Sequence, residues 1–164
     1  DFAQAGREAN EAMRAAVLRA AGPGDGRPLL ELYAGAGNFS LPLAAAGWRV
    51  VANDLVRPAA ALAGVDFVAQ DAVEFVEGLV AQGGAFGTVV LDPPRVGALE
   101  VARGLADVAG LQRIVYVSCD PMTLARDVAA MTAGAWRLER AQAIDMMPQT
   151  FHVETVALLV RAGG

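Results

Sequence analysis

The stretch LELYAGAGNFS, residues 30–40, decides the fold class, because it reads as a buried strand that runs into a glycine turn and then a helix. Gly35 and Gly37 let the backbone approach a ligand closely and adopt dihedral angles that side chains disfavour. A dinucleotide fingerprint would need a third glycine where this chain has Ser40. The stretch therefore predicts a ligand site at a strand end that does not suit a pyrophosphate group. A tight turn without a ligand is the alternative interpretation.

Short β-branched and aliphatic runs alternate with Ala-rich helical stretches after this motif, as in a doubly wound sheet. We expect strands at residues 29–33, 49–53, 66–69, 88–91 and 113–117. Residues 136–161 hold two further β-like runs around a turn at 146–149, which predict an antiparallel hairpin at the edge of the sheet. A helix is expected over residues 8–21, before a Gly-Pro-Gly stop. The chain is predicted to be one α/β domain with a mostly parallel, seven-stranded, Rossmann-like sheet.

Composition excludes several classes of protein. The 164 residues are 55% hydrophobic, but no apolar run reaches the roughly 18 residues that a membrane span needs. A single cysteine cannot form an internal disulfide, which suits a reducing cytoplasm. The single histidine leaves a zinc site or a serine triad without a second one. The net charge of -5 opposes strong sequence-independent binding to phosphate. We expect a cytoplasmic monomer with neither metal nor membrane.

Acidic side chains follow three of the expected strands, at the sheet edge where ligands bind in such folds. Asp54 comes at the end of the second strand, where a carboxylate can accept both hydroxyls of a ribose. Asp71 follows the third strand and is placed to receive an adenine amino group. Helix capping is an equally good interpretation of both residues. The segment LDPPR, residues 91–95, is a stiff loop that presents Asp92 at the same edge.

Two further residues carry possible chemistry. Cys119 lies between the fifth strand and a helix, and the positive partial charge at a helix N-terminus favours a nucleophilic thiolate. A lone cysteine is otherwise a small buried hydrophobe. His152 and Glu154 are two residues apart, so in an extended strand they face the same side. Glu154 in a half-buried cleft can act as a base, whereas His152 is interpreted as orienting its neighbours.

Taken together, these segments resemble the RNA 5-methyluridine (uracil-C5) methyltransferase family. The matching segments are FAQ (2–4), ELYAGAGNF (31–39), LDPPR (91–95), YVSCDPMTLARD (116–127) and DMMPQTFHVET (145–155). The resemblance implies the Rossmann-like fold of class I S-adenosylmethionine-dependent methyltransferases. It also implies that residues 1–164 form a catalytic domain, without the N-terminal RNA-binding barrel that many members carry.

The resemblance implies a role for each site residue. Cys119 would be the nucleophile and Glu154 the base. The residues implied to bind the cofactor are Gln4, Tyr33, Gly35, Gly37, Asn38, Asp54, Asp71 and Asp92. The residues implied to bind the substrate are Gln4, Asp92 and Arg95. The implied reaction moves a methyl group from S-adenosylmethionine to carbon 5 of a uridine in tRNA or 23S rRNA through a covalent Cys119 adduct, and leaves S-adenosylhomocysteine.

The chain departs from the family pattern at three positions. Gly6 and Asp120 replace residues that are often Asn, and Asp54 replaces a common Glu. These changes leave Cys119 and Glu154 intact but affect residues close to the predicted base site. Two other functions remain open at this stage: a cytosine-C5 RNA methyltransferase, and a cofactor-binding module without turnover. The identity of the methylated nucleoside separates the first, and cofactor binding without methyl transfer would indicate the second.

Overall fold

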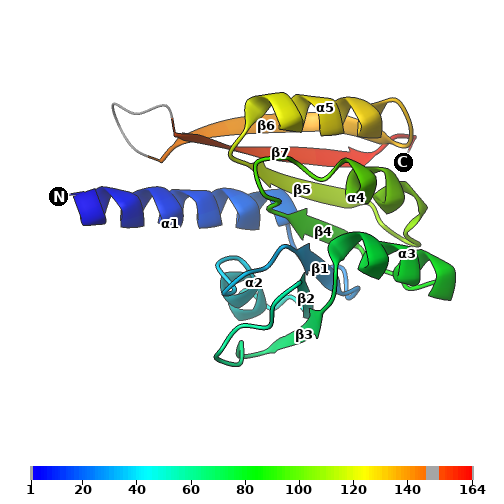
Figure 1. The fold of residues 1–164 in the computed structure, drawn as a ribbon, viewed down its shortest axis with the longest axis horizontal. Coiled ribbons are helices and arrows are strands. Elements are labelled where there is room, and N and C mark those ends of the chain that lie inside the picture. Colours follow the sequence, from blue (N-terminus) through cyan, green and yellow to red (C-terminus); the bar gives the residue numbers. More distant parts are fainter. Residues whose placement is uncertain (1, 147–151, 164) are drawn as a thin grey trace.

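The computed structural model describes residues 2–146 and 152–163, with side chains described from residue 5 onward. Helices and strands alternate through most of these residues (Figure 1). The elements are α1 (Phe2–Ala21), β1 (Leu29–Leu32), α2 (Ser40–Ala45), β2 (Val50–Asp54), β3 (Val65–Ala69), α3 (Ala72–Gln82), β4 (Thr88–Leu91), α4 (Leu99–Gly104), the 3₁₀ helix η1 (Leu105–Asp107), β5 (Arg113–Ser118), α5 (Pro121–Thr132), β6 (Trp136–Asp145) and β7 (Val153–Arg161).

One seven-stranded sheet forms the centre of the molecule, in the order β3-β2-β1-β4-β5-β7-β6. The first five strands along the chain pair in parallel, whereas β7 runs antiparallel to both β5 and β6. The prediction of a mostly parallel sheet with a C-terminal antiparallel hairpin is confirmed. The strand order reverses between β1 and β4, and such a reversal opens a crevice at the carboxyl ends of the strands.

Helices cover both faces of this sheet. Leu30 and Leu32 of β1 pack with α3, α4 and α5 on one face. Leu29 packs with α1 and α2 on the other. Successive side chains of a strand point to opposite faces, so every residue of β1 is buried. The result is a three-layer α/β/α sandwich in which β1 and β4 are buried along their whole length.

Several element boundaries differ from their predicted positions. The strand predicted over 29–33 ends at Leu32, because Tyr33 turns to a φ of 61°, the only positive φ at a non-glycine among the described residues. Strand β2 runs over Val50–Asp54 instead of 49–53, so Asp54 is its last residue. Helix α1 begins at Phe2 instead of residue 8. It continues through Gly6, which costs a helix only about 1 kcal/mol.

The C-terminal hairpin lies beside α1. Figure 1 shows the first half of α1 extending past the central strands toward the side where β6 ends and β7 begins, and α1 contacts both strands. The N–H of Met146 donates to the carbonyl oxygen of His152 at 3.1 Å and closes the hairpin at this end. The turn predicted at 146–149 otherwise lies outside the described residues. Glu154 is held by this hairpin.

Leu43 in α2 is fully buried against the sheet, whereas Leu41 in the same short helix is 41% exposed. We expect Leu43→Ala to lower the free energy of unfolding by about 2–5 kcal/mol, because it removes apolar contacts and leaves a cavity. Leu41→Ala should change it by less than about 0.5 kcal/mol. Urea unfolding followed by circular dichroism measures both. Equal losses would show that α2 is not anchored through Leu43.

Candidate active site

The glycine turn after β1 is tethered to the end of β2. The N–H of Gly35 donates to Asp54 Oδ2 at 2.8 Å, and the N–H of Val56 donates to Asp54 Oδ1 at 3.3 Å. Gly35 has a φ of 54°, and no atom lies within 4 Å of the position that a Cβ would take there. Asp54 therefore organises a turn whose backbone is open to a ligand on the Gly35 side.

Helix α1 also holds the glycine turn, through side-chain hydrogen bonds to Asn38. The amide groups of Asn10 and Asn38 exchange two hydrogen bonds of 3.1 and 3.0 Å, and Arg14 Nε donates to Asn38 Oδ1 at 2.9 Å. Asn10 and Arg14 are four residues apart, so they share one face of the helix. Asn38, which the sequence places in the cofactor site, is thus the contact between the glycine turn and α1.

Glu31 is a carboxyl group inside the buried part of β1. Its side chain is 1% exposed and accepts a hydrogen bond from the hydroxyl of Ser40 at the start of α2. Burial raises the pKa of Glu31 to about 8, the Ser40 bond works against that rise, and the negative charges of Asp92 and Asp54 add to it. Glu31 is therefore electrostatically coupled to the residues at the strand ends.

Asp71 caps helix α3, one of the two interpretations that its position allowed. Its Oδ1 accepts from the N–H groups of Val73 at 2.9 Å and Glu74 at 3.2 Å. Next to it, Asn53 is completely buried and donates to the carbonyl oxygens of Val68 and Gln70, while its own Oδ1 has no partner. A buried amide oxygen without a partner is uncommon and marks a position where a donor would be stabilising.

Asp92 and Glu154 form the acidic part of the site. Desolvation raises the pKa of Asp92 to about 7, and the negative charge of Glu154 adds to the rise. Desolvation also raises the pKa of Glu154, and the positive charge of His152 opposes it. The Oε2 atom of Glu154 is buried and has no hydrogen-bond partner. A half-buried carboxyl group with a raised pKa and a vacant acceptor is suited to general acid–base chemistry.

Cys119 is exposed between the end of β5 and Asp120, the residue that caps α5. The antiparallel β5–β7 pairing ends with Ser118 opposite Thr155, and Cys119 and Glu154 are the residues that flank this last pair. Asp120 caps α5 through the N–H groups of Met122 and Thr123, and these bonds lower its pKa. The two residues that the sequence singles out for chemistry thus belong to paired strands, next to the end of their ladder.

The remaining predicted residues differ in how closely they join this group. Tyr33, directly after β1, is half-buried, and its burial and the nearby carboxylates raise the pKa of its hydroxyl to about 12. Arg95 is exposed after the Pro93-Pro94 turn, and its charge acts on Asp120. Gln4 lies in α1, and its side chain is outside the described part of the chain. The residue roles themselves stay predictions.

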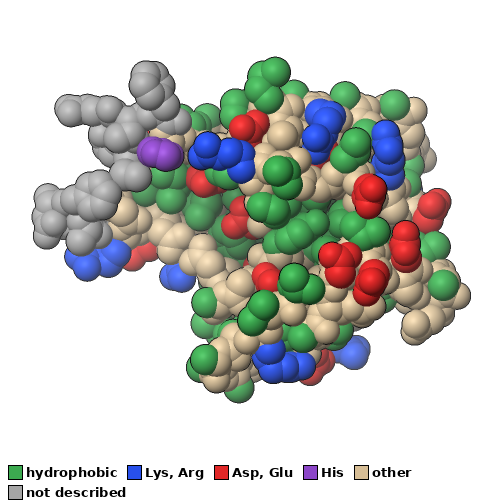
Figure 2. Space-filling view, viewed as in Figure 1, with side chains coloured by type: hydrophobic (Ala, Val, Ile, Leu, Met, Phe, Trp, Pro, Cys, Tyr) green, Lys and Arg blue, Asp and Glu red, His purple; other side chains and the backbone are tan. Residues whose placement is uncertain are grey.

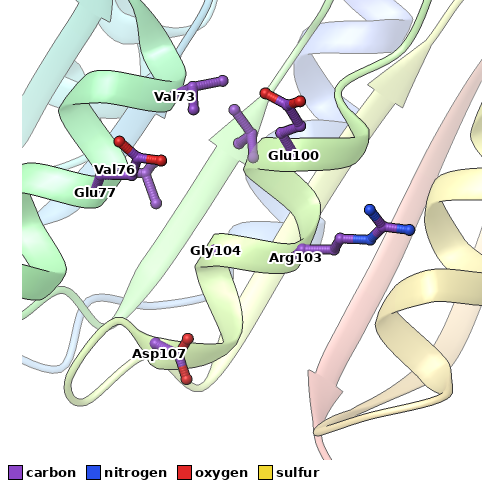
Figure 3. A pocket seen from close by; sticks show the side chains of 8 residues that line it. Val73, Val76, Glu77, Glu100, Arg103, Gly104 and Asp107 are labelled. Carbon is purple, nitrogen blue, oxygen red and sulfur yellow. The ribbon is translucent and has the colours of Figure 1, made fainter.

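Grooves lie on the face that carries α3, α4 and α5, and two of them involve α4 or the loop before it. Acidic side chains gather over α3 and α4 in Figure 2, and Figure 3 shows Glu77, Glu100 and Asp107 around the groove between these helices. None of the predicted site residues lines it. The second groove is lined by Tyr33, residues 96–101 and Arg126, next to the strand ends. The described residues include neither a metal-binding cluster nor a helix long and apolar enough to cross a membrane.

A family model described as tRNA (uracil-5-)-methyltransferase matches this chain over residues 1–82 and 72–162. The chain belongs to this family. The 23S rRNA (uracil(1939)-C(5))-methyltransferase RlmD of Pseudomonas fluorescens Pf0-1 is 42% identical over 96% of the chain and 36% of its own length. RlmD of Pseudomonas aeruginosa PAO1 is 41% identical over 96% of the chain and 37% of its own length. The chain therefore spans just over a third of these relatives.

Solved structures agree with this family membership. The tRNA (uracil-54, C5)-methyltransferase of Pyrococcus abyssi, in complex with S-adenosyl-L-homocysteine, superposes with a TM-score of 0.75 at 31% identity, over 92% of this chain and 37% of that one. Magnesium protoporphyrin IX methyltransferase of Synechocystis PCC 6803 has a TM-score of 0.67 at 16% identity, over 99% of this chain and 85% of that one, which shows the fold alone. The predicted methyltransferase fold and the predicted family resemblance are confirmed.

Sequence reasoning missed several residues that shape the site. Glu31 lies in an aliphatic strand, and its role was not predicted. Its alternation with Leu30 and Leu32 indicates only that it faces the opposite side of the sheet from them. Asn10 and Arg14 carried only the signal of helical spacing in a segment before the first strand. Asn53 read as an ordinary strand residue. Each of these residues acts through a partner elsewhere in the chain, and no local sequence pattern predicts such a pairing.

Glu31 predicts a pH dependence of stability. The ordinary pKa of 4.5 rises to about 8 in the folded state, so the folded protein holds a proton that the unfolded chain releases between these values. The stabilisation that comes from this proton is full below pH 4.5 and is lost as pH rises toward 8. Glu31→Gln should remove this part of the pH dependence, leave the part that comes from the raised pKa of Asp92, and stabilise the protein at pH 8 by a few kcal/mol, at about 1.4 kcal/mol per pKa unit.

Urea unfolding at pH 5.5 and pH 8.5 measures the effect of Glu31→Gln. Glu139→Gln, on the exposed surface of β6, is the matched control and should leave the pH dependence unchanged. A parental pH slope retained by Glu31→Gln would contradict the assignment of this proton.

Proposed function

We propose that this chain is the catalytic portion of an enzyme that transfers a methyl group from S-adenosylmethionine to carbon 5 of a uridine in RNA. One observation carries the proposal: the exposed Cys119 and Glu154, whose Oε2 is buried without a partner, flank the last residue pair of the β5–β7 ladder. The named relatives, which methylate uracil in ribosomal or transfer RNA, support the substrate class. Whether tRNA or rRNA is the natural target is an outcome of the test.

The strand ends fit the proposed cofactor. Asp54 uses two of the roughly four acceptor positions of a carboxylate, so it has capacity for the hydroxyls of a ribose. The open side of Gly35 allows a ligand to lie against the backbone. Asp92, Glu154 and Glu31 have raised pKa values in a desolvated cluster, and a cation is stabilising beside such carboxyl groups. S-adenosylmethionine carries a positive sulfonium centre and supplies the methyl group when bound.

The proposed mechanism uses two protein groups in sequence. Carbon 5 of uracil is a weak nucleophile because its electrons are delocalised into the ring. The Cys119 thiolate adds to carbon 6, and the electron pair displaced onto carbon 5 forms the new bond to the methyl group, while the methyl–sulfur bond of S-adenosylmethionine breaks and its electron pair stays on sulfur. Glu154 then removes the proton from carbon 5. The returning electron pair restores the ring double bond and expels Cys119 as a thiolate, ready for the next base.

The RNA must present an unstacked base at the strand ends. A thiolate reaches carbon 6 only from above or below the ring, so a flipped or loop uridine is the expected substrate. The acidic groove between α3 and α4 would repel the RNA backbone, because sequence-independent binding depends on Lys and Arg. Arg95, exposed beside the site, is the residue proposed to contact the substrate strand.

The proposal is tested by incubating the chain with labelled S-adenosylmethionine and unmodified tRNA or 23S rRNA, followed by nucleoside analysis. Cys119→Ala should reduce label in 5-methyluridine by at least about 10⁴-fold while it leaves cofactor binding unchanged, because the thiol has no role in holding the cofactor. Thr132→Ala, at the far end of α5, is the control. Parental rates of transfer by Cys119→Ala would refute the covalent mechanism. Label in 5-methylcytidine would show that the enzyme is a cytosine-C5 RNA methyltransferase instead.

Glu154→Gln separates the two chemical steps. Without a base to remove the carbon 5 proton, the methylated base should remain attached to Cys119, and a protein–RNA adduct stable to denaturation should accumulate. Denaturing gel electrophoresis with labelled RNA measures it. Glu139→Gln on the neighbouring strand should turn over normally. An adduct that also forms in Cys119→Ala/Glu154→Gln would show that another residue is attached to the base.

A further inference from the structure

Residues 95–98, here called the 95–98 loop, leave the Asp92-Pro93-Pro94 turn and lead into α4. Side chains of α5 hold the backbone of this loop. The hydroxyl of Thr123 donates to the carbonyl oxygen of Arg95 at 2.9 Å. Arg126 Nη2 donates to the carbonyl oxygen of Val96 at 2.9 Å. Backbone carbonyls outside regular structure are thus satisfied by one neighbouring helix.

Asp127, the next residue of α5, completes the attachment from a fully buried position. Its Oδ2 accepts from the N–H of Ala98 at 2.7 Å and from the hydroxyl of Tyr116 at 2.6 Å. Its Oδ1 accepts from Arg126 Nε at 2.9 Å and lies 2.9 Å from Arg126 Nη2. Burial and the bond to Asp127 raise the pKa of Tyr116, so its hydroxyl stays protonated and keeps donating.

Gly97 makes the close contact possible from the side of the loop. It has a φ of 77°, and a Cβ there would lie 2.7 Å from both Arg126 Nη2 and Asp127 Oδ2 and 3.1 Å from Thr123 Cβ. Only glycine suits both the backbone conformation and the space. The loop and α5 are therefore matched surfaces.

We propose that Thr123, Arg126 and Asp127 are positioning residues: they fasten the 95–98 loop to α5 and thereby fix the distance between Asp92 and Cys119. The inference rests on the proposed function and says how the nucleophile of that reaction is kept at a fixed distance from Asp92, a residue implied to bind cofactor and substrate. Asp92 precedes the loop by three residues, and Cys119 precedes α5 by two. The hydrogen bonds of α5 thus connect the segment proposed to contact the target base with the helix that carries the nucleophile.

Stability alone is a weak reason for this network. A buried ion pair loses much of its attraction to the cost of desolvation, and apolar side chains of similar volume often stabilise a fold as well or better. A carboxylate that accepts hydrogen bonds from a loop, from a strand and from its own helix instead holds these three elements in one arrangement. A misplacement of about 1 Å at a reacting group can cost roughly 100-fold in rate.

The helix side is tested with Asp127→Asn and the milder Tyr116→Phe, which deletes one hydroxyl and keeps the ring. In folded variants we expect the rate of methyl transfer at saturating RNA and cofactor to fall roughly 10- to 100-fold for Asp127→Asn and less for Tyr116→Phe. The cofactor Kd is measured in parallel, because Asp92 is also implied to bind the cofactor and the saturating rate separates slower transfer from weaker binding. Full rate in folded Asp127→Asn, or a loss confined to thermal stability, would overturn the inference.

The loop side is tested with Gly97→Ala. Gly26→Ala is its matched control, because Gly26 has a φ of 86° but no atom within 4 Å of the new Cβ. Gly97→Ala should reduce the rate as Asp127→Asn does, and the double variant should lose no more than about the larger single loss, because both break the same contact. Multiplied losses in the double variant would contradict a shared role. Equal rate losses in Gly26→Ala and Gly97→Ala would do the same.

Hydrogen exchange at the Ala98 amide gives a readout independent of catalysis. Its protection should be lost in Asp127→Ala, which removes the oxygen that accepts from this amide, and retained in Gly26→Ala, whether or not the parent methylates RNA. A parent that binds cofactor but transfers no methyl group would refute the proposed function, and retained Ala98 protection in Asp127→Ala would refute the positioning network.

Discussion

Burial of β1 and β4 on both faces is the constraint on which the rest of this structure depends. Every residue of these two strands is buried, with helices against either side. Strands covered in this way pair in parallel through helical crossovers, and their backbone is satisfied within the sheet. Polar side chains can then meet ligands only where the strands end. Tyr33 and Asp92 directly follow β1 and β4 and are the first polar side chains beyond these two strands.

Glu31 is the exception to this separation of apolar strand and polar edge. A carboxyl group within a buried strand is costly when ionised. Burial raises the pKa of Glu31 to about 8, so the group is neutral at lower pH, and it accepts a hydrogen bond from Ser40. It couples the start of α2 to the charges of Asp54 and Asp92. The glycine turn and the helix start that follows it are thereby held at three points: Ser40 by Glu31, Gly35 by Asp54, and Asn38 by Asn10 of α1.

Much of this arrangement could be predicted from local patterns. The runs of aliphatic residues indicated the strands to within a residue or two, because alternation and turn residues are local signals. Cys119 and Glu154 stand out through their motifs, and in the structure they flank the last residue pair of the β5–β7 ladder. The position of Asp71 allowed two interpretations, a ligand contact or a helix cap, and the structure shows that it caps α3. Tyr33 was placed in a strand because nothing in its neighbours indicates a positive φ.

The sequence by itself determined the fold class, the family and the residues suited to chemistry, since these depend on period, turn chemistry and short motifs. Tertiary structure decided which of them touch. The pairing of Asn10 with Asn38 joins residues 28 apart, and that of Asp127 with Ala98 joins residues 29 apart. The raised pKa values of Asp92 and Glu154 also arise only in the fold, because desolvation depends on how elements distant along the chain pack together.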